Sequence, residues 1–161
     1  MMNKFNKSLA IGKAIENYVA SYLTGKGHLV DNKSDDAAYQ SKDIDFILYK
    51  NGNTTTLEVK ADSRLHDTHN FFFEVGFNRD TGYYDGWFRK CAAAYICFVD
   101  YICGKAYIID FNKDIIAANA TSKRWVNYYD ECIGDALLLN IDKARELNLI
   151  SYEWTFKEEL L

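Results

Sequence analysis

The sequence contains no proline, and it also lacks any long apolar run. Without proline, no helix is interrupted by a missing backbone donor, and no cis peptide bond is expected. No apolar stretch approaches the roughly 20 residues that a membrane-spanning helix needs. The N-terminal segment has no signal-peptide core, because Lys13 and Glu16 interrupt it. These absences argue against a membrane-spanning helix and predict a cytoplasmic protein.

Cysteine is scarce, and its spacing points to no common motif. The four cysteines are Cys91, Cys97, Cys103 and Cys132. They form no C-x-x-C pair, and two of them lie in strand-like apolar surroundings. Buried free thiols in a reducing cytosol are the simplest interpretation. A zinc site or a disulfide remains the alternative.

Length and composition predict one folded domain over residues 1–161. The chain is long enough to bury a sizeable core, and its apolar content of 48% is that of a globular protein. Aromatic residues are abundant at 16%, which favours a strand-rich protein with much apolar surface to bury. Disorder is therefore not expected.

The overall charge does not suggest a nucleic-acid partner. The net charge is −4 and the pI is near 5.4, whereas most nucleic-acid-binding proteins are basic. The charge is uneven, however, because lysine outnumbers acid in residues 1–33. A bound cation would also offset acidity locally.

Hydrophobic periodicity and turn residues predict the order of the elements. A first helix is expected over residues 7–25, with Asn6 or Ser8 as its cap and Gly25 or Gly27 at its end. We expect strands at 28–32, 70–77, 94–101, 105–110, 137–141 and 150–156, and a hairpin at 42–62. Loops are expected at 33–42, 61–69 and 78–85. Further helices are expected at 86–91, 112–118 and 142–147. Asp110 or Asn112 would cap the second of these helices, and Asp142 the third. Residues 119–135 give no clear prediction.

The hairpin at 42–62 carries the most informative pattern in the chain. Its composition favours a two-residue turn at Gly52-Asn53. That turn pairs Phe46 with Val59, Leu48 with Leu57, Asp45 with Lys60, and Ile47 with Glu58. One face is then apolar and packs on the core, and the other face gathers Asp45, Glu58 and Lys60. A slip of one residue would put the two acids on opposite faces.

Two carboxylates beside a lysine suit metal-assisted hydrolysis of a phosphodiester. Mg²⁺ prefers oxygen ligands, which Asp45, Glu58 and the backbone carbonyl of Val59 could supply. The ion would activate a water and neutralise charge at phosphorus. Lys60 would orient that water or stabilise the charge of the transition state. The alternative is that Glu58 and Lys60 form a surface ion pair of little energetic value.

These residues resemble the motif of the PD-(D/E)xK nuclease superfamily. Asp45 matches the acid of the first strand, and Glu58-Val59-Lys60 matches the (D/E)-x-K of the second, although Ile44 stands where the motif name has proline. The segment from Gly12 to Glu16 is similar to a Gly-x-x-x-Glu pattern on the first helix of Holliday-junction resolvase-type nucleases. The resemblance covers residues 8–101.

The resemblance implies a fold, a reaction and a cofactor. The fold would be α/β, with the αβββαβ core of restriction endonucleases, a central mixed sheet flanked by helices, and extra C-terminal strands and helices. The activity would be hydrolysis of DNA with Mg²⁺, for which Mn²⁺ could substitute. Glu16 would then assist at the metal, whereas the helical pattern alone favours a solvated helix residue at this position. Enzymes of this fold often act as homodimers.

Residues outside the motif were assigned by their surroundings. Arg64, Arg89 and Lys90 are candidates for contacts with DNA phosphates. His66 and His69 are interpreted as solvated loop histidines, although they could contact phosphate or a metal. Two further side chains are interpreted structurally: Glu74 as an exposed strand residue rather than a further ligand, and Trp87 as part of the core.

Two other functions stay open at this point. One is a nucleic-acid-binding member of the same fold without catalysis, against which the intact set of two acids and a lysine argues. The other is an inhibitor or interaction protein that binds a protein partner through its acidic surface. The sequence does not distinguish endonuclease from exonuclease, or DNA from RNA as the substrate.

Overall fold

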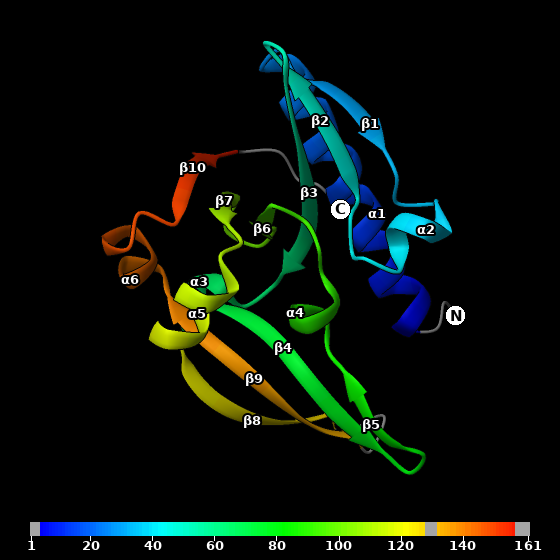
Figure 1. Cartoon of the computed structure of the whole chain (residues 1–161), viewed down its shortest axis with the longest axis vertical. Coiled ribbons are helices and arrows are strands. Elements are labelled where there is room, and N and C mark those ends of the chain that lie inside the picture. The colour runs from blue at the N-terminus through cyan, green and yellow to red at the C-terminus, as the bar shows by residue number, and fades with distance from the viewer. Residues whose placement is uncertain (1–3, 128–131, 157–161) are drawn as a thin grey trace.

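The structure is a computed structural model that describes residues 4–127 and 132–156. Six helices and ten strands lie within these residues (Figure 1). The helices are α1 (Lys4–Gly25), α2 (Ala37–Gln40), α3 (Leu65–Thr68), α4 (Trp87–Lys90), α5 (Lys113–Asn119) and α6 (Ile141–Glu146). The strands are β1 (Leu29–Asn32), β2 (Phe46–Lys50), β3 (Asn53–Asp62), β4 (Asn70–Arg79), β5 (Gly82–Asp85), β6 (Tyr95–Asp100), β7 (Lys105–Asp110), β8 (Thr121–Asn127), β9 (Cys132–Asn140) and β10 (Ile150–Thr155).

The strands form two sheets. The larger sheet has the order β1-β2-β3-β6-β7-β10, and only the β3–β6 pair in it is parallel. The smaller sheet has the order β5-β4-β9-β8 and is antiparallel throughout. The expected α/β class with a central mixed sheet is therefore confirmed. The smaller sheet was not foreseen, and it lies below the larger one in Figure 1.

Two apolar clusters make up the core, one on each face of the larger sheet. The first lies between that sheet and α1 and includes Ile15, Val19, Phe46, Leu57 and Val59. The second joins the opposite face to the smaller sheet and the short helices, through Phe71, Phe73, Ile96, Phe98 and Leu139. Both faces of β3 are thus covered, because its side chains alternate between the two clusters.

The β2–β3 hairpin turns one residue earlier than predicted. Asn51 and Gly52 are the turn residues, with φ of 50° and 78°, and Lys50 pairs with Asn53. The predicted turn at Gly52-Asn53 is therefore wrong. The physical reason is that asparagine tolerates the left-handed conformation, so an Asn-Gly pair forms the tight turn that the strand twist favours.

The predicted pairs across the hairpin are also wrong, because each shifts by two residues. Phe46 pairs with Leu57 rather than Val59, and Leu48 pairs with Thr55. A shift of two leaves every side chain on its original face, since the side-chain period of a strand is two. The predicted separation of apolar and acidic faces consequently survives an incorrect register.

Two matched substitutions test the turn. Asn51→Val should destabilise the protein by about 1–2 kcal/mol, because a β-branched residue is strained at positive φ. Asn53→Val should leave stability nearly unchanged, because position 53 is an exposed strand residue, where valine is favoured. Urea denaturation of both variants measures the difference. Equal losses would contradict the observed turn.

Several element boundaries differ from expectation. Helix α1 begins at Lys4, so Asn6 and Ser8 lie inside it and neither is its cap. Helix α6 is capped by the side chain of Asn140, which accepts from the backbone N–H groups of residues 142 and 143, so Asp142 is not the cap. The predicted cap of α5 by Asn112 is confirmed. Three segments predicted as loops contain short elements, namely α2, α3 and the β4–β5 hairpin.

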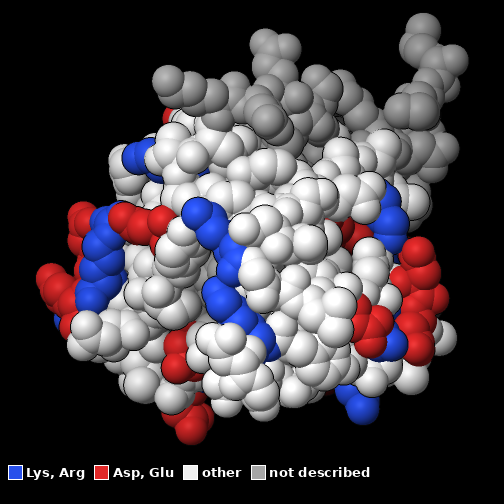
Figure 2. All heavy atoms as spheres, turned by 90° about the horizontal axis from the view of Figure 1, so that it is seen from above, with Lys and Arg blue, Asp and Glu red and all other residues white. Residues whose placement is uncertain are grey.

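None of the helices in the described ranges is long and apolar enough to span a membrane. Charged side chains gather at two sides of the end of the molecule that carries the β2–β3 hairpin, where acidic and basic groups lie together (Figure 2). Surface ion pairs join α6 to β10, and join α1 and β1 to the segment before α2. A short run of basic side chains crosses the largely uncharged surface between the two sides.

Candidate functional site

Strand β3 presents Glu58 and Lys60 towards the second apolar cluster. Their neighbours Leu57 and Val59 point the other way, towards α1. Glu58 is only 5% exposed, and its Oε1 lies 2.5 Å from Lys60 Nζ. The ammonium also lies 4.7 Å from the ring centre of Trp87 on α4. The polar face of the hairpin is therefore a buried ion pair under an aromatic ring, not a solvated surface pair.

Asp45 lies beside this pair, immediately before β2. Its backbone N–H donates to the carbonyl of Leu57, and its Oδ2 accepts from the backbone N–H of Val59 at 2.8 Å. The Asp45 carboxylate thus extends the hydrogen bonding between β2 and β3 by one step before the first residue of β2. Because the N–H and C=O of a strand residue point to the same edge, the Val59 carbonyl faces this edge too.

Helix α1 brings Glu16 to the same region. Glu16 is half-buried, and its Oε2 is buried without a hydrogen-bond partner. The nearest cation is Lys13 Nζ at 3.4 Å, which also binds Ser34 and Asp35. Burial raises the pKa of Glu16, and the charge of Asp45 raises it further. Glu16 is therefore electrostatically coupled to the hairpin acids rather than solvated.

A further acid, Asp43, was missed in the sequence. It adopts a left-handed conformation with φ of 47°, which aspartate and asparagine adopt more readily than most other residues. Its Oδ2 is buried without a hydrogen-bond partner, while its carbonyl accepts from the Cys91 thiol at 3.3 Å. The Asp-Ile-Asp spacing of residues 43–45 could have indicated it, since alternate residues of an extended segment share a face.

We call Glu16, Asp43, Asp45, Glu58 and Lys60 the Lys60 cluster. Burial raises the pKa of Glu58 to about 8, with Lys60 opposing and Asp45 adding to the shift. Burial likewise raises the pKa of Asp45, against the hydrogen bond from Val59. Burial favours the neutral form of Lys60, but Glu58 and then Asp43 and Asp45 hold its pKa above the usual value. Asp43, Asp45 and Glu58 share the ammonium of Lys60, while Glu16 pairs with Lys13, so acids outnumber cations and the cluster has room for further positive charge.

Glu74 on β4 approaches the cluster from the smaller sheet. The prediction that it is an exposed strand residue is wrong, because the side chain is half-buried. Burial raises its pKa, and the charges of Lys60 and Lys90 oppose that rise. The reason for the error is that β5 and α4 fold back over β4, which a local pattern does not predict.

The three arginine and lysine residues proposed for phosphate contacts are all exposed, but they do not gather at one place. Lys90 lies near enough to Glu74 to influence its pKa. Arg89 pairs with Asp85 at 3.0 Å, and Arg64 lies at the far end of β3 before α3. Trp87 packs against the second apolar cluster, as predicted.

The histidine and cysteine predictions were partly wrong. His66 is not a solvated loop residue, because its ring contacts Asp100 at 3.0 Å, whereas His69 is exposed. Cys91, Cys97 and Cys132 are buried free thiols, as expected, but Cys103 is exposed. The cause in both cases is the β6–β7 turn, which brings Asp100 and Cys103 to the N-terminal end of α3.

The donors of the Lys60 cluster fit a hard divalent cation. Carboxylate oxygens on Asp43 and Glu58 are buried without hydrogen-bond partners, and such atoms are costly unless a proton or a cation satisfies them. The buried oxygen of Glu16 has only the ion pair with Lys13 at 3.4 Å. The acids do not form a complete set of ligands around one point, because the Lys60 ammonium lies against Glu58. Within residues 4–127 and 132–156, only His66, Asp100 and Cys103 bring three ligand atoms within 4.8 Å of one another.

A separate apolar cavity of about 410 Å³ lies between the C-terminal end of α1, the β2–β3 hairpin and β10. Its walls include Leu23, Leu48, Leu57 and Ile108, and no acidic side chain lines it. A metal-assisted hydrolysis therefore has no carboxylate ligands there, and the Lys60 cluster is the better candidate for such chemistry.

Comparisons with protein-family models, with curated proteins and with solved structures found no match. The functional interpretation consequently rests on the residues of this chain.

Proposed function

We propose that the chain is a metal-dependent nuclease that hydrolyses DNA phosphodiester bonds at the Lys60 cluster. The observation that carries the proposal is that three acids, Asp43, Asp45 and Glu58, act on the one ammonium of Lys60. Buried oxygens of Asp43 and Glu58 have no hydrogen-bond partner, and Glu16 on α1 is electrostatically coupled to Asp45. A purely structural ion pair needs one acid per lysine. Surplus buried acids cost stability, which a bound divalent cation would recover.

Asp45, Glu58 and the carbonyl of Val59 are the proposed ligands of Mg²⁺, with Mn²⁺ as a substitute. Glu58 and Val59 lie on β3, and Asp45, which directly precedes β2, is already held by the backbone of Val59. When bound, the ion would lower the pKa of a water and offset charge at phosphorus. Asp43 and Glu16 would complete the surroundings of the ion, with Glu16 acting from α1.

Lys60 has the position of the group that stabilises the reacting phosphate. In the structure its ammonium satisfies Glu58. A cation on Glu58 would free this ammonium to orient the attacking water or to stabilise transition-state charge. The ring of Trp87 would keep the ammonium from swinging away, because a cation over an aromatic face is attracted to it.

The arrangement of the larger sheet supports the restriction-endonuclease-like interpretation of the fold. Strands β1, β2 and β3 form an antiparallel meander, and β6 adds to β3 in parallel orientation. Helix α1 packs on one face of this set. The smaller sheet then counts as an addition to the core, since β4 and β5 intervene between β3 and α4. Exposed Arg64, Arg89 and Lys90 are proposed phosphate contacts, and a homodimer would extend the surface for DNA.

A panel of labelled substrates tests the proposal: duplex, single strand, flap, four-way junction and RNA, each with Mg²⁺, Mn²⁺ or EDTA. We expect cleavage of at least one DNA substrate with either metal and none with EDTA. Asp45→Asn should reduce the rate about 100-fold or more, because it removes a charged ligand without changing the side-chain volume. Cleavage that persists in EDTA, or no cleavage of any substrate, would reject the metal-dependent nuclease.

A further inference from the structure

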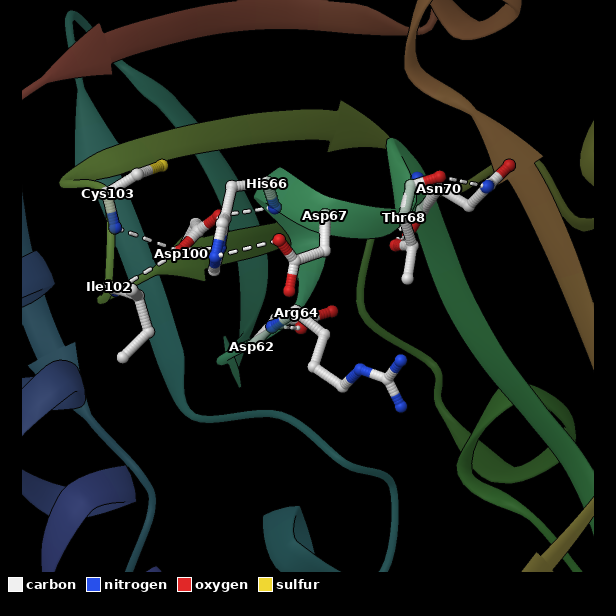
Figure 3. Close-up of polar contacts among 9 residues, drawn as sticks. All are labelled: Asp62, Arg64, His66, Asp67, Thr68, Asn70, Asp100, Ile102 and Cys103. Carbon is white, nitrogen blue, oxygen red and sulfur yellow. Dashed lines mark hydrogen bonds and ion pairs between the residues drawn. The ribbon is translucent and has the colours of Figure 1, made fainter.

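A second cluster of polar side chains lies beyond the end of β3, where α3 meets the turn between β6 and β7 (Figure 3). His66 comes from α3, Asp100 is the last residue of β6, and Cys103 comes from the turn that follows. One ligand atom of each lies within 4.8 Å of the other two. We propose that these three residues bind a zinc ion. The site is separate from the Lys60 cluster and does not depend on the proposed nuclease activity.

The distances suit a tetrahedral zinc site. His66 Nδ1 is 3.0 Å from Asp100 Oδ2, which is close to the separation of two ligands that bind one ion at about 2.0–2.2 Å. The Cys103 sulfur lies within 4.8 Å of both atoms, and its side chain is exposed on a turn, where it can move to complete the set. A nitrogen, an oxygen and a sulfur ligand together favour zinc over magnesium, which prefers oxygen alone.

The neighbours of the three ligands have the positions that support a metal site. Histidine ligands in metal sites usually donate their second ring N–H to a carboxylate. Asp67 provides that carboxylate, because its Oδ1 is 3.4 Å from His66 Nε2. Asp100 is only 1% exposed and accepts from the backbone N–H groups of His66, Ile102 and Cys103. These bonds fix its carboxylate before any ion arrives.

Binding would require a defined change of protonation. The Cys103 thiol loses its proton to solvent, and the His66 ring carries its remaining proton on Nε2, facing Asp67. The fourth position would be open to a cavity of about 330 Å³ that His69 also lines, so a water molecule can complete the shell. The ion would tie α3 to a turn 34 residues further along the chain.

Cobalt absorption spectroscopy tests the site, with Co²⁺ as the probe in place of zinc. We expect a thiolate-to-cobalt charge-transfer band that saturates at one ion per chain and disappears when zinc is added. Cys103→Ala should remove the band, and His66→Gln should weaken it. Asp67→Asn should lower the affinity about 10–100-fold, as for other partners of ligating histidines. Circular dichroism checks that each variant folds.

Asp45→Asn serves as the control for the Lys60 cluster. It should keep the charge-transfer band, because carboxylates give no thiolate transition, even if it abolishes cleavage. The charge-transfer band therefore tests the zinc site alone, and cleavage tests the nuclease proposal alone. The zinc site is rejected if reduced wild-type protein shows no thiolate band with excess Co²⁺, or if the band persists in Cys103→Ala. Asp100 would then serve only to hold α3 and the turn between β6 and β7 together.

Discussion

Lys60→Met should lower the single-turnover rate of Mg²⁺-dependent DNA cleavage about 100-fold or more. Methionine keeps much of the side-chain length and its contact with Trp87 but removes the ammonium that lies 2.5 Å from Glu58. The loss should appear in the rate constant at saturating substrate, because the ammonium acts on charge that develops at the reacting phosphate. Rapid-quench measurement with labelled DNA follows this rate directly.

Lys143→Met is the matched control for this effect. Lys143 lies on α6, where it pairs with Glu146 at the surface, and it takes no part in the Lys60 cluster. Its cleavage rate should stay within about twofold of wild type, because surface ion pairs contribute little. Unchanged cleavage by Lys60→Met, in protein that melts like wild type, would remove Lys60 from the mechanism.

Glu58→Gln should abolish cleavage and yet stabilise the metal-free protein by about 2 kcal/mol or more at pH 8–9. Burial raises the pKa of Glu58 to about 8, so the folded state holds this proton more tightly than the unfolded chain does. The stabilisation from protonated Glu58 is complete below about pH 4.5, the unfolded value, and is lost as the pH rises through about 8. Glutamine imitates the protonated form and does not titrate.

The pH dependence gives this prediction its sharpest form. The stability difference between Glu58→Gln and wild type should be small near pH 5 and should grow towards pH 9, measured by urea denaturation in EDTA. Adding Mg²⁺ should raise the melting temperature of wild type, more at high pH, and should have little effect on the variant. Glu146→Gln, an exposed change on α6, should give no such trend. A Glu58→Gln variant that is less stable than wild type across this range would contradict a strained carboxylate.

The faces of the hairpin could be predicted from the sequence, but its turn could not. Alternation of apolar and acidic residues depends only on the parity of the register, so Glu58 and Lys60 were placed on one face despite a wrong turn. The choice between Asn51-Gly52 and Gly52-Asn53 depends on a left-handed asparagine, which composition alone does not decide. Local pattern was therefore sufficient to assign the residues to the two faces but not to predict their pairing.

Burial of the site was beyond local prediction. Glu58 and Lys60 are covered because β4 and β9 form a second sheet that packs over the larger one. The pairing of β4 with β9 joins residues that are far apart in the chain, such as Asn70 and Asn140. Long-range pairing of this kind leaves no periodic signal within a short window. For the same reason the burial of Glu74 was not predicted and Asp43 was missed, because distant segments build their surroundings.

The most direct test of the metal-site proposal is a crystal structure with Mn²⁺, located by its anomalous scattering. We expect one strong peak between Asp45 and Glu58, with carboxylate oxygens and the Val59 carbonyl at about 2.2 Å, and with Lys60 Nζ displaced from Glu58. An anomalous map without a peak at these residues, with the Glu58–Lys60 pair intact at saturating Mn²⁺, would contradict the proposal that this cluster binds the catalytic cation.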